Sequence, residues 1–284
     1  MSDATTPQSA DTARTTGAPI LTIDDLTIGI GSRNNVKAIV KGISLALTPG
    51  RVQGLAGESG SGKTVTSLAI LGLLPHNAIV GGSIRLGDTE LVGLPRRQLN
   101  DIRGRRIAMI FQDPSSSLHP QLTVGTQLTD HVKRHMKLST KQARVHAIAL
   151  LERVRVPNPE EALARYPHQF SGGQRQRISI AIALACDPVV LLADEPTTAL
   201  DVTVQAGILH LLRDLVDERQ LAVLLVTHDL GVMSAIADDI AVMRHGEVVE
   251  ANSRHEVFTN PQHAYTRELL SSLPGATGFR EAKE

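Results

Sequence analysis

The sequence "RVQGLAGESGSGKTVTSLAILGLL", residues 51–74, is the most informative part of this chain. Its centre, Gly57–Thr64, satisfies the pattern G-x-x-x-x-G-K-[ST]. A short apolar run precedes the pattern and a helical run follows it, which is the strand–loop–helix context that phosphate binding needs. Glycines in such a loop let backbone N–H groups turn inward around phosphate oxygens. The sequence therefore predicts a nucleotide phosphate site between a strand and a helix.

Individual residues of this loop have separate predicted roles. Lys63 supplies a positive charge for the terminal phosphates, and Thr64 offers a hydroxyl to Mg²⁺. We therefore expect a nucleotide and Mg²⁺ as the ligands. The predicted nucleotide-binding residues of the loop are Gly57, Glu58, Ser59, Gly60, Ser61, Gly62, Lys63 and Thr64.

Polar side chains end three later apolar runs. The run "PVVLLADEP" is typical of a strand buried on both faces, and it places Asp194 beside the phosphate loop. Asp194 is predicted to hold Mg²⁺, and Glu195 to act as the base on the attacking water. His228 ends "AVLLVTH" and is predicted to contact the γ-phosphate and to orient water and base. Gln112 ends "IAMIFQ" and is predicted to bind the nucleotide and Mg²⁺ through its amide oxygen.

A second glycine pair at the start of a helix lies in "FSGGQRQRISIAIALA", residues 170–185. Backbone N–H groups at a helix N-terminus also favour phosphate. The chain already has one such loop more than a hundred residues upstream, so one nucleotide does not account for both.

The composition excludes several classes of protein. Lys and Arg together number 29, as do Asp and Glu, so no net charge attracts the chain to nucleic acid or anionic lipid. Cys186 is the single cysteine, which excludes a disulfide framework; we expect it to be a small core residue. Apolar runs such as residues 221–226 are too short to span a bilayer. Any action at a membrane therefore needs a partner.

Strand and helix patterns alternate along most of the chain, which predicts a mostly parallel sheet with right-handed crossovers. From about residue 124 to 166 the pattern is helical instead. Ser139 and Gln142 form a predicted capping box. An apolar stripe follows at spacings of four, four and three. It consists of Ala143, Ala147, Leu151 and Val154.

The motifs "GESGSGKT", "FQDP", "SGGQ", "LLADEP", "ALD" and "THD" occur once each and in this order. With them the chain resembles the nucleotide-binding subunits of ABC transporters over about residues 20–273. The segments "IFQDPSSSLHP", "ADEPTTALDVT" and "HAYTRELLSSLP" are similar, more narrowly, to the ATPases of oligopeptide, dipeptide and nickel importers.

The resemblance explains the second glycine pair. In that family two nucleotide-binding domains pair head to tail, and the "SGGQ" loop of each contacts the ATP bound by the other. Asp201 is implied to lie at the interface of the pair. The residues implied to contact the partner's ATP are Ser171, Gly172, Gly173 and Gln174.

The resemblance implies an α/β P-loop NTPase of ABC type, whose mostly parallel sheet core carries an antiparallel β subdomain and an inserted helical subdomain. We expect a disordered leader at 1–18, the nucleotide-binding domain at 19–273 with its helical subdomain at about 113–170, and a flexible tail at 274–284. The block 112–166 is implied to contact the transmembrane permease subunits.

The implied setting is the cytoplasmic face of the cell membrane, where the chain is peripheral. The implied partners are the permease subunits, a second ABC ATPase subunit, identical or related, and indirectly an extracytoplasmic substrate-binding protein. Nucleic acid is not expected. The cargo stays open between a di- or oligopeptide and a nickel or metal chelate.

Other functional classes fit less well. An ABC ATPase acting on DNA needs a long coiled coil before the signature, but Lys63 and Ser171 are only 108 positions apart and the segment between them lacks sustained heptads. Ribosome-acting ABC proteins carry two ATPase domains, whereas this chain has one copy of each motif. A simple P-loop kinase has no use for the "SGGQ" element.

Two further patterns in the sequence lead to predictions. Family members usually stack an early aromatic ring on adenine, but no aromatic residue precedes Phe111. The equivalent position is Ile30, with Arg33 and Val36 nearby, so we expect weaker discrimination between ATP and GTP. His131 and His135 have helical i,i+4 spacing, and without a third ligand we expect a solvated or subunit-facing pair.

Overall fold

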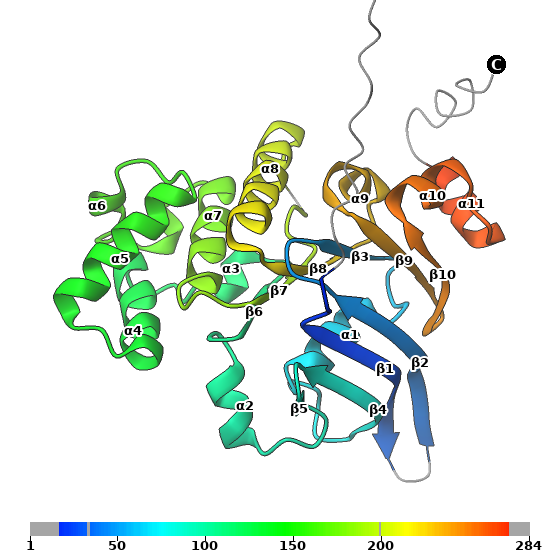
Figure 1. Ribbon diagram of the computed structural model, residues 1–284. Coiled ribbons are helices and arrows are strands. Elements are labelled where there is room, and N and C mark those ends of the chain that lie inside the picture. The colour runs from blue at the N-terminus through cyan, green and yellow to red at the C-terminus, as the bar shows by residue number, and fades with distance from the viewer. Residues whose placement is uncertain (1–16, 33–34, 199, 273–284) are drawn as a thin grey trace, which may run out of the picture.

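The computed structural model describes residues 17–32, 35–198 and 200–272 (Figure 1). Residues 1–16 of the expected leader, the expected tail at 274–284 and Arg33 near the adenine position lie outside this part. The described chain forms two sheets with helices around them, as the α/β prediction requires.

The larger sheet has six strands in the order β10-β9-β3-β8-β7-β6. All neighbours pair in parallel except the antiparallel hairpin of β9 and β10. The prediction of a mostly parallel sheet is therefore confirmed. The strands are β3 (Val52–Ala56), β6 (Ile107–Ile110), β7 (Val190–Asp194), β8 (Ala222–Thr227), β9 (Asp239–Arg244) and β10 (Glu247–Ser253).

The strands of the larger sheet divide their side chains between two apolar clusters. In β7, Leu191 and Ala193 belong to the cluster that includes the helical subdomain. Val190 and Leu192 belong to the cluster that includes side chains of the second sheet and of α1 (Lys63–Ile70). Burial on both faces explains why the apolar runs are continuous rather than alternating.

The second sheet is antiparallel throughout, with the order β2-β1-β4-β5, and confirms the predicted antiparallel subdomain. In Figure 1 helix α1 lies between this sheet and the larger one. The strands are β1 (Leu21–Ser32), β2 (Asn35–Leu47), β4 (Ala78–Leu86) and β5 (Thr89–Glu90).

The segment 124–166 is mainly helical, but it is not one continuous helix. Lys137 adopts a left-handed conformation, with φ 57°, and ends α4, so a new helix begins after the capping box of Ser139 and Gln142. That box and the burial of the predicted apolar stripe are both confirmed. The helices and the 3-10 turn of this region are α3 (Pro114–Ser117), α4 (Val124–Met136), α5 (Thr140–Arg153), α6 (Pro159–Ala162) and η1 (Pro167–Gln169).

The remaining helices surround the larger sheet, while α2 follows the antiparallel one (Figure 1). They are α2 (Arg96–Ile102), α7 (Gly172–Ala183), α8 (Val202–Arg219), α9 (Leu230–Ile236), α10 (Arg254–Thr259) and α11 (Ala264–Ser271). None of the helices in the described ranges is long and apolar enough to cross a lipid bilayer.

Candidate nucleotide site

The phosphate loop connects β3 to α1, as the motif predicts. Gly57, Gly60 and Gly62 have φ values of 149°, 80° and 111°, a region that favours glycine. At Gly57 a Cβ atom would also lie 2.1 Å from the carbonyl oxygen of Met243 on β9. The loop conformation therefore depends on glycine at these positions.

The side chain of Lys63 is buried and folds back onto its own loop. Its Nζ donates hydrogen bonds to the carbonyl oxygens of Gly57 and Glu58 at 2.7 and 2.8 Å. Burial lowers the pKa of Lys63, against the opposing effect of the Glu195 and Asp194 carboxylates. An ammonium group has three N–H donors, so Lys63 has one beyond these two bonds; its Nζ also lies 3.5 Å from the Ser61 hydroxyl oxygen.

Asp194 and Thr64 face each other across the ends of β7 and α1. The Thr64 hydroxyl donates to Oδ1 of Asp194 at 3.2 Å. Burial and the neighbouring Glu195 charge raise the pKa of Asp194, although Thr64 and Lys63 oppose them. Both side chains present oxygen atoms of the type that Mg²⁺ prefers.

Glu195 turns away from the line of β7. Its φ of 46° lies in the left-handed region, and its backbone N–H donates to the carbonyl oxygen of Val226 on β8 at 2.8 Å. A non-glycine residue in that region is uncommon. The turn places the adjacent carboxylates of Asp194 and Glu195 in different surroundings.

Both carboxylate oxygens of Glu195 have partners. Oε1 lies 2.7 Å from Nδ1 of His228. Oε2 accepts hydrogen bonds from the Thr198 hydroxyl at 2.7 Å and from Nε2 of Gln112 at 3.2 Å. Burial alone would raise the pKa of Glu195, but the bonds from His228 and Thr198 outweigh it, so the pKa lies below its ordinary value. The structure thus brings together Glu195, His228 and Gln112, which the sequence singled out separately.

The signature loop caps α7. The Ser171 hydroxyl accepts from the N–H of Gln174 at 3.3 Å, and the Gln174 side chain accepts from the N–H of Ser171 at 3.0 Å. Asp201 caps the neighbouring helix α8 in a similar way, through the N–H of Val204 at 2.9 Å. The two caps are coupled by packing, because a Cβ atom on Gly173 would lie 2.5 Å from Cγ1 of Val204. Their contact with a partner's nucleotide stays a prediction.

Sequence reasoning missed two side chains of this site. Thr198 lies within the quoted "ADEPTTALD" segment, but nothing in the pattern separates it from its neighbours. Tyr265 lies 70 residues after Glu195 in the chain, and its hydroxyl accepts a hydrogen bond from the N–H of Glu58 at 3.1 Å. Only the fold shows that this tyrosine contacts the phosphate loop.

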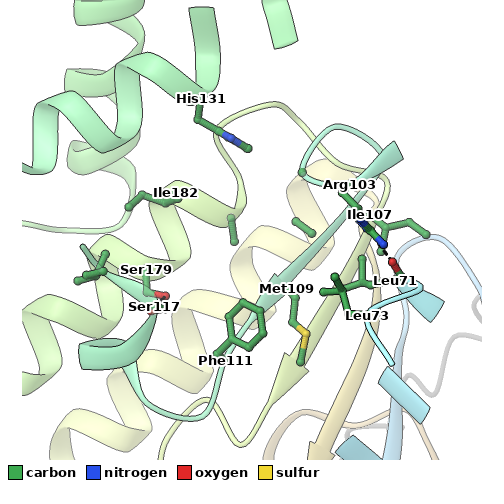
Figure 2. A pocket seen from close by; sticks show the side chains of 14 residues that line it. Leu71, Leu73, Arg103, Ile107, Met109, Phe111, Ser117, His131, Ser179 and Ile182 are labelled. Atoms are coloured by element: carbon green, nitrogen blue, oxygen red, sulfur yellow. Dashed lines mark hydrogen bonds between the residues drawn. The ribbon is translucent and has the colours of Figure 1, made fainter. Parts of the chain in front are cut away.

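A separate groove lies between the larger sheet and the helical subdomain (Figure 2). Its volume is about 230 Å³. Leu73 and Phe111 in its wall are 43% and 39% exposed, and Phe111 directly precedes Gln112. The lining includes Leu71, Leu73, Arg103, Met109, Phe111 and Ile182.

His131 also lines this groove and is half-buried there, so the expectation of a solvated or subunit-facing pair stays a prediction. Its ring packs so closely on Gly104 that a Cβ atom there would lie 2.6 Å away. Burial and the nearby His135 lower the pKa of His131, and the two rings are 4.9 Å apart. In the described ranges no group of three His, Cys, Asp or Glu side chains could hold a metal ion. Cys186 is buried, as expected, and burial raises the pKa of its thiol to about 11.

A phosphate loop of this form, beside an acidic pair on a neighbouring strand end and followed by a capped glycine helix, defines the class of P-loop ATPases built as ABC cassettes. The sequence matches the family described as ABC transporter over residues 40–198. The chain therefore belongs to the ABC transporter family, as an ATP-binding cassette with ATPase activity.

Two similar relatives have names that describe transport. The dipeptide transport ATP-binding protein DppD of Bacillus subtilis (strain 168) is 46% identical over 257 residues, which cover 90% of this chain and 77% of that protein. The oligopeptide transport ATP-binding protein AmiE of Streptococcus pneumoniae serotype 4 is 47% identical over 257 residues, covering 90% of this chain and 72% of that protein.

Two solved structures are similar in fold. The ATP-binding cassette MJ0796, described as a dimeric post-hydrolysis state bound to ADP and Pi, has a TM-score of 0.73 and 27% identity, and covers 82% of this chain and 98% of its own. The cbiO1 protein of Clostridium perfringens, described as part of the ABC transporter complex cbiONQ, has a TM-score of 0.72 and 26% identity. The match covers 91% of this chain and 97% of that protein.

Proposed function

We propose that this chain hydrolyses ATP to power the import of a dipeptide or oligopeptide through a membrane permease. The observation that carries the cargo class is the identity of 46–47% to relatives named for dipeptide and oligopeptide transport. We propose the cassette boundaries 19–273, with the helical subdomain at about 113–170. The chain is then a peripheral protein at the cytoplasmic face, and a substrate-binding protein outside the membrane delivers the cargo.

In the proposed mechanism Glu195 removes a proton from the attacking water. Its depressed pKa keeps the carboxylate ionised at neutral pH, ready to accept that proton. Its two oxygens accept three hydrogen bonds and can accept about four, so the attacking water either takes the remaining site or replaces the weakest bond. The bond from Gln112, at 3.2 Å, is the longest of the three and the easiest to lose. His228 holds the other oxygen and keeps the base oriented.

Thr64, Asp194 and Gln112 are the proposed Mg²⁺ ligands. Their hydroxyl, carboxylate and amide oxygens form a donor set suited to this cation, and Thr64 and Asp194 already lie in contact. When bound, Mg²⁺ would neutralise charge that develops on the phosphates. The loop residues Gly57–Thr64 would surround those phosphates, with Lys63 turned toward them.

Two partners complete the proposed assembly. A second ABC ATPase chain, identical or related, would receive the Ser171–Gln174 loop on its nucleotide and contact Asp201. A permease segment with an apolar side chain would occupy the groove beside Phe111. Because Phe111 adjoins Gln112, movement in the groove is transmitted to the residue that contacts Glu195.

Isolation of the native complex from detergent-solubilised membranes tests this proposal. We expect two multi-span permeases and a second ATPase to co-purify, with a peptide-binding protein encoded or recovered alongside. A double variant Leu73→Asp/Phe111→Asp should lose the permeases while the isolated chain still binds ATP. The control Ile79→Asp changes an apolar side chain that is 59% exposed on β4, outside the groove and outside the block 112–166, and should retain them. Recovery of the wild type only with ribosomes or DNA would contradict transport.

A further inference from the structure

The peptide unit between Gly57 and Glu58 is held from both sides. Its carbonyl oxygen, on Gly57, accepts from Nζ of Lys63 at 2.7 Å. Its N–H group, on Glu58, donates to the hydroxyl oxygen of Tyr265 at 3.1 Å. A peptide unit is planar and rigid, so these two opposed bonds fix its rotation.

Tyr265 is itself firmly placed. Its side chain is 1% exposed, and the guanidinium of Arg244, at the end of β9, lies 4.5 Å from the centre of its ring. His263 caps α11 by accepting from the N–H of Tyr265 at 3.1 Å. The Glu250 carboxylate on β10 accepts from the N–H groups of Gln262 and His263 at 2.8 and 2.9 Å. The larger sheet therefore fixes the position of the tyrosine hydroxyl.

We expect nucleotide binding to affect the two bonds on this peptide unit differently. If Gly57–Thr64 is the phosphate site, as proposed above, Lys63 shares its three N–H donors between the phosphates and the loop carbonyls. Of the two side-chain bonds on the peptide unit, the one to Tyr265 is then the one for which phosphate does not compete. It uses an N–H group directed away from the position of Lys63, so it does not compete with phosphate.

We propose that Tyr265 is a positioning residue for nucleotide binding, whose hydroxyl holds the Gly57–Glu58 peptide in place while Lys63 also bonds the phosphates. Tyr265 lies outside the family match at residues 40–198. The nucleotide site therefore extends into the C-terminal helix α11, which carries none of the nucleotide-binding motifs. The inference rests on the proposed phosphate site and adds a residue to it.

The variant Tyr265→Phe isolates the hydroxyl, because it keeps the ring, its core packing and its contact with Arg244. Calorimetric titration of the full-length chain with Mg-ADP should show a Kd raised roughly two- to tenfold, the loss expected for one neutral hydrogen bond. In the assembled transporter KM for ATP should rise by the same factor with kcat nearly unchanged, because the bond acts equally on bound substrate and transition state. Hydrogen exchange of the Glu58 amide should become faster.

The matched control is Tyr166→Phe, the same chemical change at the chain's other tyrosine, which is 40% exposed in the helical subdomain. It should leave Kd and Glu58 exchange unchanged. An unchanged Kd and unchanged Glu58 exchange in Tyr265→Phe would overturn the inference, even if Tm fell. Failure of the wild type to bind Mg-ADP would instead overturn the proposed phosphate site, and Glu58 exchange would still report whether Tyr265 holds the peptide.

Discussion

Oε1 of Glu195 lies 2.7 Å from Nδ1 of His228, and the two residues follow adjacent parallel strands, β7 and β8. Parallel strands end at the same edge of a sheet, so two residues 33 positions apart in the chain meet there. The contact joins the proposed base to the side chain that orients it.

Replacing Glu195 by Gln should separate ATP binding from hydrolysis. The amide can still accept from Thr198, so the fold and the nucleotide site persist, but it cannot take a proton from water. We expect hydrolysis by the assembled transporter to fall at least about 100-fold while ATP binding is retained and the paired state accumulates. Phosphate release and equilibrium ATP binding measure the two effects. Near-normal turnover would show that Glu195 is not the base.

Removing His228 should change the pH dependence of hydrolysis. The bond from His228 lowers the pKa of Glu195, so its loss in His228→Ala raises that pKa. Because hydrolysis needs ionised Glu195, the acid limb of the kcat profile should move to higher pH, and kcat at neutral pH should fall roughly 100-fold. His228→Asn, which keeps a donor group, should shift the limb less. Identical acid limbs in wild type and His228→Ala would refute the coupling.

Asp194→Asn should stabilise the nucleotide-free protein while it abolishes hydrolysis. Burial raises the pKa of Asp194 in the folded state, so its ionisation opposes folding increasingly as the pH rises from the unfolded pKa through the folded pKa. A neutral amide of the same shape removes that penalty and can still accept from Thr64. We expect a higher Tm at pH 7, no gain at pH 3, and hydrolysis reduced at least about 100-fold. A lower Tm at pH 7 would contradict this.

Gly173→Ala should destabilise the protein through a specific neighbour. The added methyl group would lie 2.5 Å from Cγ1 of Val204, and a clash of that kind costs about 1–3 kcal/mol of unfolding free energy. Val204→Ala removes the clashing atom, so the double variant should recover part of the loss, measured by denaturant unfolding. Gly172→Ala is the control, because its nearest neighbour, Leu200, would be at an ordinary 3.7 Å. Strict additivity of Gly173→Ala and Val204→Ala would contradict the proposed clash.

Ile30→Tyr tests adenine recognition. Ile30 lies near the end of β1, paired with Lys37 on β2 and Ala78 on β4. A ring there can stack on the base, worth about 1 kcal/mol or a several-fold gain in affinity. We expect tighter ATP binding and a larger preference for ATP over GTP. Equal affinities and equal preference in wild type and variant would show that this position does not contact the base.

Local patterns were enough to predict the phosphate loop, both later carboxylates and the capping box at Ser139, since each depends on a short run of residues. The resemblance of the ordered motifs added the antiparallel subdomain and the pairing of two cassettes. Contacts between residues that are far apart in the sequence could not be predicted from it. The bond between Tyr265 and Glu58 joins residues 207 positions apart, and the His131 ring packs on Gly104, 27 residues earlier. Neither residue has a neighbouring sequence pattern that marks its partner.

Successive side chains of β7 point alternately into the two apolar clusters, and this limits which changes in the length of the strand the protein can tolerate. Asp194 is on the same face of the strand as Val190 and Leu192, whose side chains pack in the cluster that includes α1. This is why its carboxylate contacts Thr64. Insertion or deletion of one residue within the strand would turn the Asp194 carboxylate toward the opposite face of the sheet. A change of two residues would keep the facing but move the carboxylate about 6–7 Å along the strand, so we expect the length of β7 to be fixed by the site as well as by the core.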